Sequence, residues 1–111
     1  MLFRSELSEF EKSLDAIERA RKFFKEEKDV VSVGRCDHKI AKIMNAMGEY
    51  EEAIKVASRS LDVFLTARDQ AREIYARWEL SKAQISAEDL NPALDNLEKR
   101  SEEHTSELQS H

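Results

Sequence analysis

The chain has 111 residues, of which 37% are charged, and its formal net charge is −5 at pH 7. Only two glycines and one proline are present, and no apolar run approaches the ~20 residues of a membrane span, which argues against a turn-rich β protein and a membrane protein. The acidic balance, with no basic stretch longer than Arg19 to Lys25, argues against a nucleic-acid partner.

The hydrophobic periodicity predicts an all-α chain of about five amphipathic helices, the first covering about residues 6–27. Asp29 is placed to cap the second helix, which ends near residue 47. Gly48 follows, and glycine accepts the left-handed conformation that commonly ends a helix. Cys36, the single cysteine, shares the apolar stripe of this helix. We therefore expect a buried thiol and a reducing, cytoplasmic setting.

The third predicted helix covers about residues 49–66, and the fourth runs from a cap at Asp69 to about residue 87. A fifth begins near residue 89, with Pro92 in its first turn, where proline is tolerated. The connections between these helices are short. Consecutive helices are therefore expected to form antiparallel hairpins.

A sequence motif returns at intervals of 40 residues. Ser-Glu-Phe-Glu-Lys-Ser-Leu at residues 8–14 is matched by Gly-Glu-Tyr-Glu-Glu-Ala-Ile at 48–54 and by Glu-Asp-Leu-Asn-Pro-Ala-Leu at 88–94 (48 − 8 = 40 and 88 − 48 = 40). A fixed period of this size is typical of stacked helical units, each of which cannot bury its apolar face alone. We therefore predict a solenoid that offers an extended binding surface.

The last twelve residues differ in kind from the rest of the chain. Residues 100–111 read Arg-Ser-Glu-Glu-His-Thr-Ser-Glu-Leu-Gln-Ser-His, which looks like a widely used short-read sequencing adapter translated in one frame. We expect residues 1–99 to form a helical repeat fragment and residues 100–111 to be a non-native tail, with the natural gene continuing past residue 99. Residues 1–99 carry 17 basic and 20 acidic side chains (18 − 1 and 23 − 3).

The middle copy of the repeat reads Met-Gly-Glu-Tyr-Glu-Glu-Ala-Ile at residues 47–54, with Ile40 and Met44 before it and Leu61 after it. This pattern resembles the tetratricopeptide repeat, in the 40-residue variant of kinesin-light-chain-like and cell-polarity scaffold proteins. The resemblance covers nearly all of residues 3–99 and implies stacked helical hairpins that bind other proteins. HEAT and armadillo repeats have a similar period, but the Gly-x-aromatic-x-x-Ala spacing argues against them. A plain helical bundle is the remaining alternative.

The resemblance also implies a partner-binding face on the first helix of each unit. Seven positions match it: Arg35, His38, Lys42, Asn45, Tyr75, Trp78 and Lys82. The first three share one side of a helix and form a basic strip, and the last three repeat that spacing with two aromatic residues. Tyrosine and tryptophan on a rigid helix face are favoured anchors for a partner. We therefore predict a protein or peptide partner that is acidic and has an apolar anchor.

Other interpretations of this face stay open. In one, Trp78 packs with Ile74 and Ile85 against a further repeat, and in another the basic strip is only a solvated surface. The alternative functions are a purely structural segment of a larger protein and a self-association module that pairs through the apolar ends of its stack.

An enzyme is not predicted. Cys36, Asp37 and His38 are consecutive, and consecutive helical residues point in different directions. They therefore do not form the converging group that catalysis requires. A Cys-x-His pair also lacks the two further ligands of a zinc site. The expectation is no catalytic residue, no metal and no cofactor.

Overall fold

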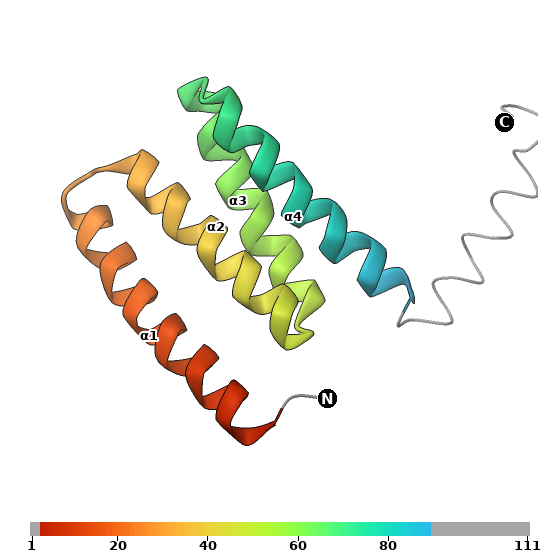
Figure 1. Ribbon diagram of the computed structural model, residues 1–111. Coiled ribbons are helices and arrows are strands. Elements are labelled where there is room, and N and C mark those ends of the chain that lie inside the picture. Colours follow the sequence, from red (N-terminus) through yellow and green to blue (C-terminus); the bar gives the residue numbers. More distant parts are fainter. Residues whose placement is uncertain (1–2, 90–111) are drawn as a thin grey trace, which may run out of the picture.

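The computed structural model describes residues 3–89, and over that range the chain folds into four α-helices without a strand (Figure 1). They are α1 (Arg4–Glu26), α2 (Val30–Met47), α3 (Tyr50–Ala67) and α4 (Gln70–Asp89). The all-α prediction is confirmed, and the four helices begin and end within a few residues of the expected positions. The predicted fifth helix and the tail at residues 100–111 lie outside the described residues.

Each helix packs against the next one in the sequence, and α2 also contacts α4. Consecutive helices run antiparallel, with α1 and α4 at opposite ends of the array (Figure 1). The prediction of packed helical hairpins is therefore confirmed for this part of the chain. None of the four helices is long and apolar enough to cross a membrane.

The turns before α2 and α4 share the same backbone conformation and the same capping hydrogen bond. In each turn a residue with left-handed backbone, Lys28 (φ 60°) or Arg68 (φ 59°), precedes the capping aspartate. Asp29 and Asp69 each accept a hydrogen bond at 3.2 Å from the backbone N–H three residues later. Since 28 and 68, like 29 and 69, differ by 40, the period of the sequence is also a period of the backbone at this turn.

The two glycines have different structural roles. Gly48 ends α2 with φ 84°, the left-handed conformation expected from the sequence. Gly34 lies inside α2 where that helix meets α3. A Cβ atom at Gly34 would lie 2.7 Å from Cγ1 of Val63 and 3.3 Å from the ring of Phe64. The missing side chain therefore lets the two helices approach closely.

The hydrophobic core lies between α2, α3 and α4. Two clusters of buried residues form it: Ile40, Ala41, Val56 and Ala57 in one, and Leu61, Phe64 and Ala76 in the other. Leu80 of α4 packs against both clusters. Helix α1 contributes no fully buried residue. Its partly buried Leu14 and Ile17 side chains pack against the first cluster. Cys36 is buried, as predicted.

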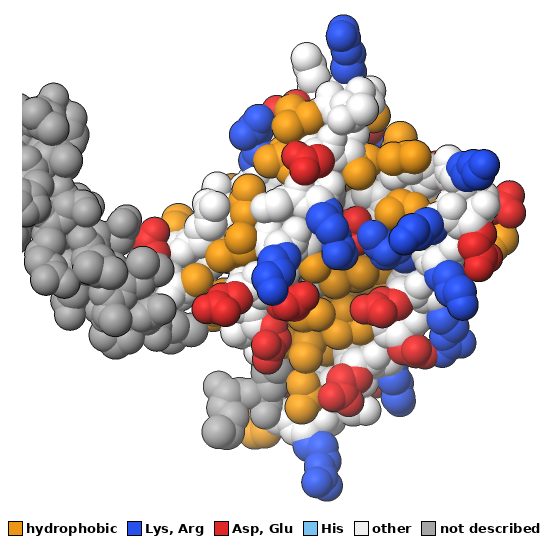
Figure 2. Space-filling model, turned by 180° about the vertical axis from the view of Figure 1, so that it is seen from behind, with side chains coloured by type: hydrophobic (Ala, Val, Ile, Leu, Met, Phe, Trp, Pro, Cys, Tyr) orange, Lys and Arg blue, Asp and Glu red, His pale blue; other side chains and the backbone are white. Residues whose placement is uncertain are grey.

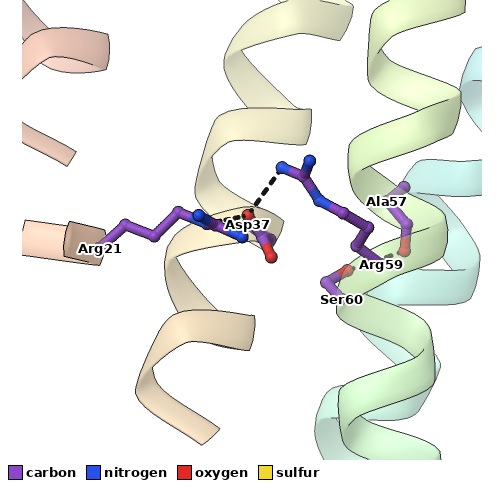
Figure 3. Close-up of polar contacts among 5 residues, drawn as sticks. All are labelled: Arg21, Asp37, Ala57, Arg59 and Ser60. Carbon is purple, nitrogen blue, oxygen red and sulfur yellow. Dashed lines mark hydrogen bonds and ion pairs between the residues drawn. The ribbon is translucent and has the colours of Figure 1, made fainter. Parts of the chain in front are cut away.

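A buried carboxylate links three helices (Figure 3). Asp37 of α2 is only 1% exposed. Its Oδ1 accepts a hydrogen bond from Nε of Arg21 in α1 at 2.7 Å and another from Nη2 of Arg59 in α3 at 3.1 Å. Burying a charge is costly unless it is paired and hydrogen-bonded, and here two guanidinium groups satisfy that condition. This network was not predicted from the sequence.

Helix α4 differs from the others in carrying apolar side chains on two sides. Ala76, Leu80 and Ala83 are buried or half-buried against the neighbouring helices. Ile74, Trp78 and Ile85 lie on the other side and are 65%, 64% and 62% exposed. Apolar side chains on two opposite sides are typical of a helix that is covered on both sides.

Candidate binding face between α2 and α4

The predicted site residues lie on α2 and α4, and the fold brings six of them together. Arg35, His38 and Tyr75 line one hollow of about 330 Å³. An adjoining hollow of about 530 Å³ is lined by His38, Lys42, Tyr75, Trp78 and Lys82, together with Ile74 and Glu79. His38 and Tyr75 line both hollows. The two hollows therefore form one continuous face between the helices.

The first hollow also contains four residues that sequence reasoning did not select, namely Lys39, Phe64, Ala71 and Arg72. The Phe64 side chain comes from α3 and is buried, so it supplies an apolar floor. No sequence pattern indicates Lys39 or Arg72 as site residues, because their position depends on how α4 lies against α2.

Asn45, the seventh predicted residue, lines neither hollow. Its side-chain nitrogen donates hydrogen bonds to the backbone oxygen of Glu79 at 3.2 Å and to Oε1 of Glu79 at 2.9 Å. Glu79 is only 4% exposed, and its carboxylate also pairs with Lys82 at 3.4 Å. Asn45 therefore joins α2 to α4 through Glu79, which itself lines the second hollow.

The basic side chains of α2 give this face its charge. Within residues 3–89, Arg35, Lys39 and Lys42 form no ion pair, whereas Arg72 is paired with Asp69 at 2.6 Å. Three cations are thus free to meet an anionic group. The chain as a whole is acidic, so this positive patch is a local departure from the average charge.

A third hollow, between α1 and α3, does not offer the same chemistry. Its four cations are accompanied by Glu18 and Glu52, and two of the four, Arg21 and Arg59, already pair with buried Asp37. Seen from behind Figure 1, the molecule likewise has basic and acidic side chains close together around an apolar strip (Figure 2). A surface of mixed charge gives little preference for one sign of partner.

His38 is half-buried at the centre of the α2–α4 face. Burial lowers the pKa of His38, and Lys42 and Lys39 act in the same direction, while Glu79 opposes them. Its Nδ1 atom is buried and has no hydrogen-bond partner among the described residues. The imidazole is therefore neutral at pH 7, and the positive charge of the face comes from the lysines and Arg35.

The lowered pKa of His38 predicts a pH-dependent stability. The unfolded chain binds a proton at His38 near pH 6.5, whereas the folded chain binds it only at lower pH. The free energy of unfolding should therefore decrease as the pH falls through about 6.5. Urea denaturation of the parent and of His38→Gln between about pH 5 and 8 measures this effect. The stability of the parent relative to the variant should fall on the acidic side of about pH 6.5 and stay constant above it; equal pH profiles would contradict the prediction.

The consecutive residues Cys36, Asp37 and His38 have separate surroundings. Cys36 and Asp37 are buried, and only His38 lines the hollows. Within residues 3–89, no group of three or more His, Cys, Asp or Glu side chains is arranged to hold a metal ion. No family model, curated protein or solved structure matches this chain. Function is therefore inferred from the residues and their geometry.

Proposed function

We propose that the chain is a protein-interaction module of the tetratricopeptide type, which binds a segment of a partner protein on the face between α2 and α4. The observation that carries this proposal is the meeting of three unpaired cations on α2 with the exposed rings of Tyr75 and Trp78 on α4. Burial raises the pKa of the Cys36 thiol, which keeps it protonated and unreactive. We place the module in the reducing cytoplasm, because its single cysteine is free.

The composition of the face indicates the chemistry of the partner. Both hollows have apolar walls that suit one large apolar side chain, and the cations beside them suit neighbouring carboxylates. Electrostatic attraction mainly sets the rate of association, while a desolvated aromatic contact mainly sets the residence time. The partner segment is therefore acidic with an apolar anchor. Its carboxylates mainly affect the association rate constant, and its apolar anchor mainly affects the dissociation rate constant.

Selection from a random peptide display library tests this proposal, because the library contains acidic, basic and apolar segments alike. Peptides enriched by the parent chain should combine Asp or Glu with one large apolar residue. Lys42→Glu should slow their association and reduce its salt dependence. Trp78→Ala should weaken binding by about 2 kcal/mol or more if the ring is an anchor. Lys55→Glu, on the exposed side of α3, is the matched control.

Circular dichroism on the same variants separates binding from folding. Trp78 is largely exposed, so the alanine variant should keep the helical content of the parent. A folded Trp78→Ala or Lys42→Glu variant that binds the selected peptides like the parent would show that they bind elsewhere.

A further inference from the structure

We propose that the first hollow of the α2–α4 face, the one that Arg35 and Phe64 line, binds a phosphotyrosine side chain of the partner segment, a refinement that rests on the proposed function. This hollow of about 330 Å³ lies between α2 and the first two turns of α4. Ligand pockets typically measure about 300–1,000 Å³, so this one suits a single side chain better than a larger ligand. The second hollow, with Trp78, stays available for the apolar anchor.

The charge of the first hollow matches that of a phosphate group. Arg35, Lys39 and Arg72 line it, and no Asp or Glu is among the described residues that do so. Arg72 is paired with Asp69 at 2.6 Å, whereas Arg35 and Lys39 have no ion-pair partner within residues 3–89. A phosphotyrosine carries a charge of about −1.5 to −2 at pH 7. Its phosphate therefore compensates both cations, whereas a single carboxylate compensates one.

The carboxylates near Arg35 are already engaged in the two capping turns. Hydrogen bonds from Ser32 lower the pKa of Asp29, and hydrogen bonds from Arg72 lower the pKa of Asp69. Arg35 acts on both carboxylates in the same direction but contributes least. It forms no ion pair with either of them, so its guanidinium group is free to donate two parallel hydrogen bonds to a phosphate.

The spacing of the two unpaired cations also favours an anion between them. Arg35 and Lys39 are four residues apart on α2, so two like charges are neighbours on the helix surface. Such a pair destabilises a helix. A phosphate bound between the two side chains replaces this repulsion with two attractions, and groups of basic side chains are a recurring means of phosphopeptide recognition.

The apolar part of the hollow fits the ring of the same side chain. Phe64 is 1% exposed and forms the floor, beside Ala71 and the ring of Tyr75. Arg35 and Lys39 are exposed, so their charges lie at the rim. A phenylalanine would cover the floor and leave these cations unpaired, and a phosphoserine has no ring to cover the floor. Of these side chains, phosphotyrosine alone satisfies both parts of the hollow.

An NMR titration of the ¹⁵N-labelled full chain tests the hollow with three probes: phenyl phosphate, inorganic phosphate and phenylacetate. Phenyl phosphate should shift the amide signals of Arg35, Lys39 and Arg72 and bind about tenfold or more tightly than either other probe. Arg35→Gln and Lys39→Gln should each weaken it about fivefold or more. Both positions are exposed, so the variants should keep the circular dichroism of the parent. Lys55→Gln, on the exposed side of α3, is the matched control and should leave the affinity unchanged.

Peptides distinguish a phosphorylated partner from a small aryl phosphate. Four peptide pools have random flanks and a fixed central residue, which is phosphotyrosine, tyrosine, phosphoserine or glutamate. The immobilised parent should retain the phosphotyrosine pool about tenfold or more over each of the others. Equal retention of the phosphotyrosine and tyrosine pools would overturn the proposal. So would binding of phenyl phosphate without any preference for the phosphotyrosine pool, because the ligand would then be a small molecule.

The same pools separate this proposal from the proposed function. If all four pools are retained equally and Trp78→Ala weakens each of them, the face binds a partner segment but not through phosphotyrosine. If no pool is retained, both proposals fail. A folded Arg35→Gln variant that keeps the full preference for phosphotyrosine would show that the phosphate lies outside the first hollow, which overturns the proposal as well.

Discussion

Replacing Arg21 and Arg59 together by methionine is expected to lower the free energy of unfolding by about 3–5 kcal/mol. The reason is that the carboxyl group of Asp37, 1% exposed, would stay buried without either of its guanidinium partners. Arg21 should account for more of the loss than Arg59, because the Arg59 side chain is 54% exposed and the Arg21 side chain 26%. Urea denaturation of the two single variants and the double variant measures these effects.

The control for this prediction removes the carboxylate as well. Adding Asp37→Leu to the Arg21→Met and Arg59→Met variant should recover most of the stability, because an apolar cluster replaces the unpaired buried charge. If the double variant is as stable as the parent, the Asp37 carboxylate is reached by water and the network has no structural role.

Gly34→Leu is the second substitution with a large expected effect, a loss of about 3 kcal/mol. Already the first atom of the new side chain would lie 2.7 Å from Cγ1 of Val63, so α2 and α3 would have to move apart. Urea denaturation should show this loss as a lower midpoint concentration of the variant, while the dependence of the unfolding free energy on urea concentration stays unchanged. A stability equal to that of the parent would mean that the two helices do not approach closely at this point.

Two further variants identify the cause of that loss. Gly34→Leu combined with Val63→Ala should recover part of the stability, because the smaller residue removes the nearest atoms in α3. Gly48→Ala should lose only about 1–2 kcal/mol, because a Cβ there would meet no described residue other than those next to it in the chain. That cost arises from the left-handed backbone alone, at φ 84°.

The helices and their period were predictable because local chemistry determines them. The spacing of apolar residues, the aspartates at positions 29 and 69 and the glycine at 48 each act within a few residues of the chain. Lys28 and Arg68 were not recognised as left-handed, because the sequence signal for that conformation is glycine or asparagine. Their equivalence became visible only in the backbone.

The candidate face between α2 and α4 was partly predictable for a related reason. Residues on one side of a single helix can be identified from their spacing, and six of the seven selected residues do meet in space. The pairing of Asn45 with Glu79 depends instead on the distance between α2 and α4. The same is true of the Asp37 network, which connects residues of three helices. Such contacts follow from tertiary packing, which one sequence does not specify position by position.

The position of α1 at one end of the array has a consequence for how the molecule opens. Among the described helices, α1 packs only on α2, and it has no fully buried residue, so it can detach while α2, α3 and α4 stay together. Its amide hydrogens should therefore exchange with solvent through a local opening that costs less than global unfolding. Detachment would also take Arg21 away from Asp37 and leave Arg59 as the partner. The strength of the Arg21–Asp37 ion pair therefore helps to set how often α1 detaches from α2.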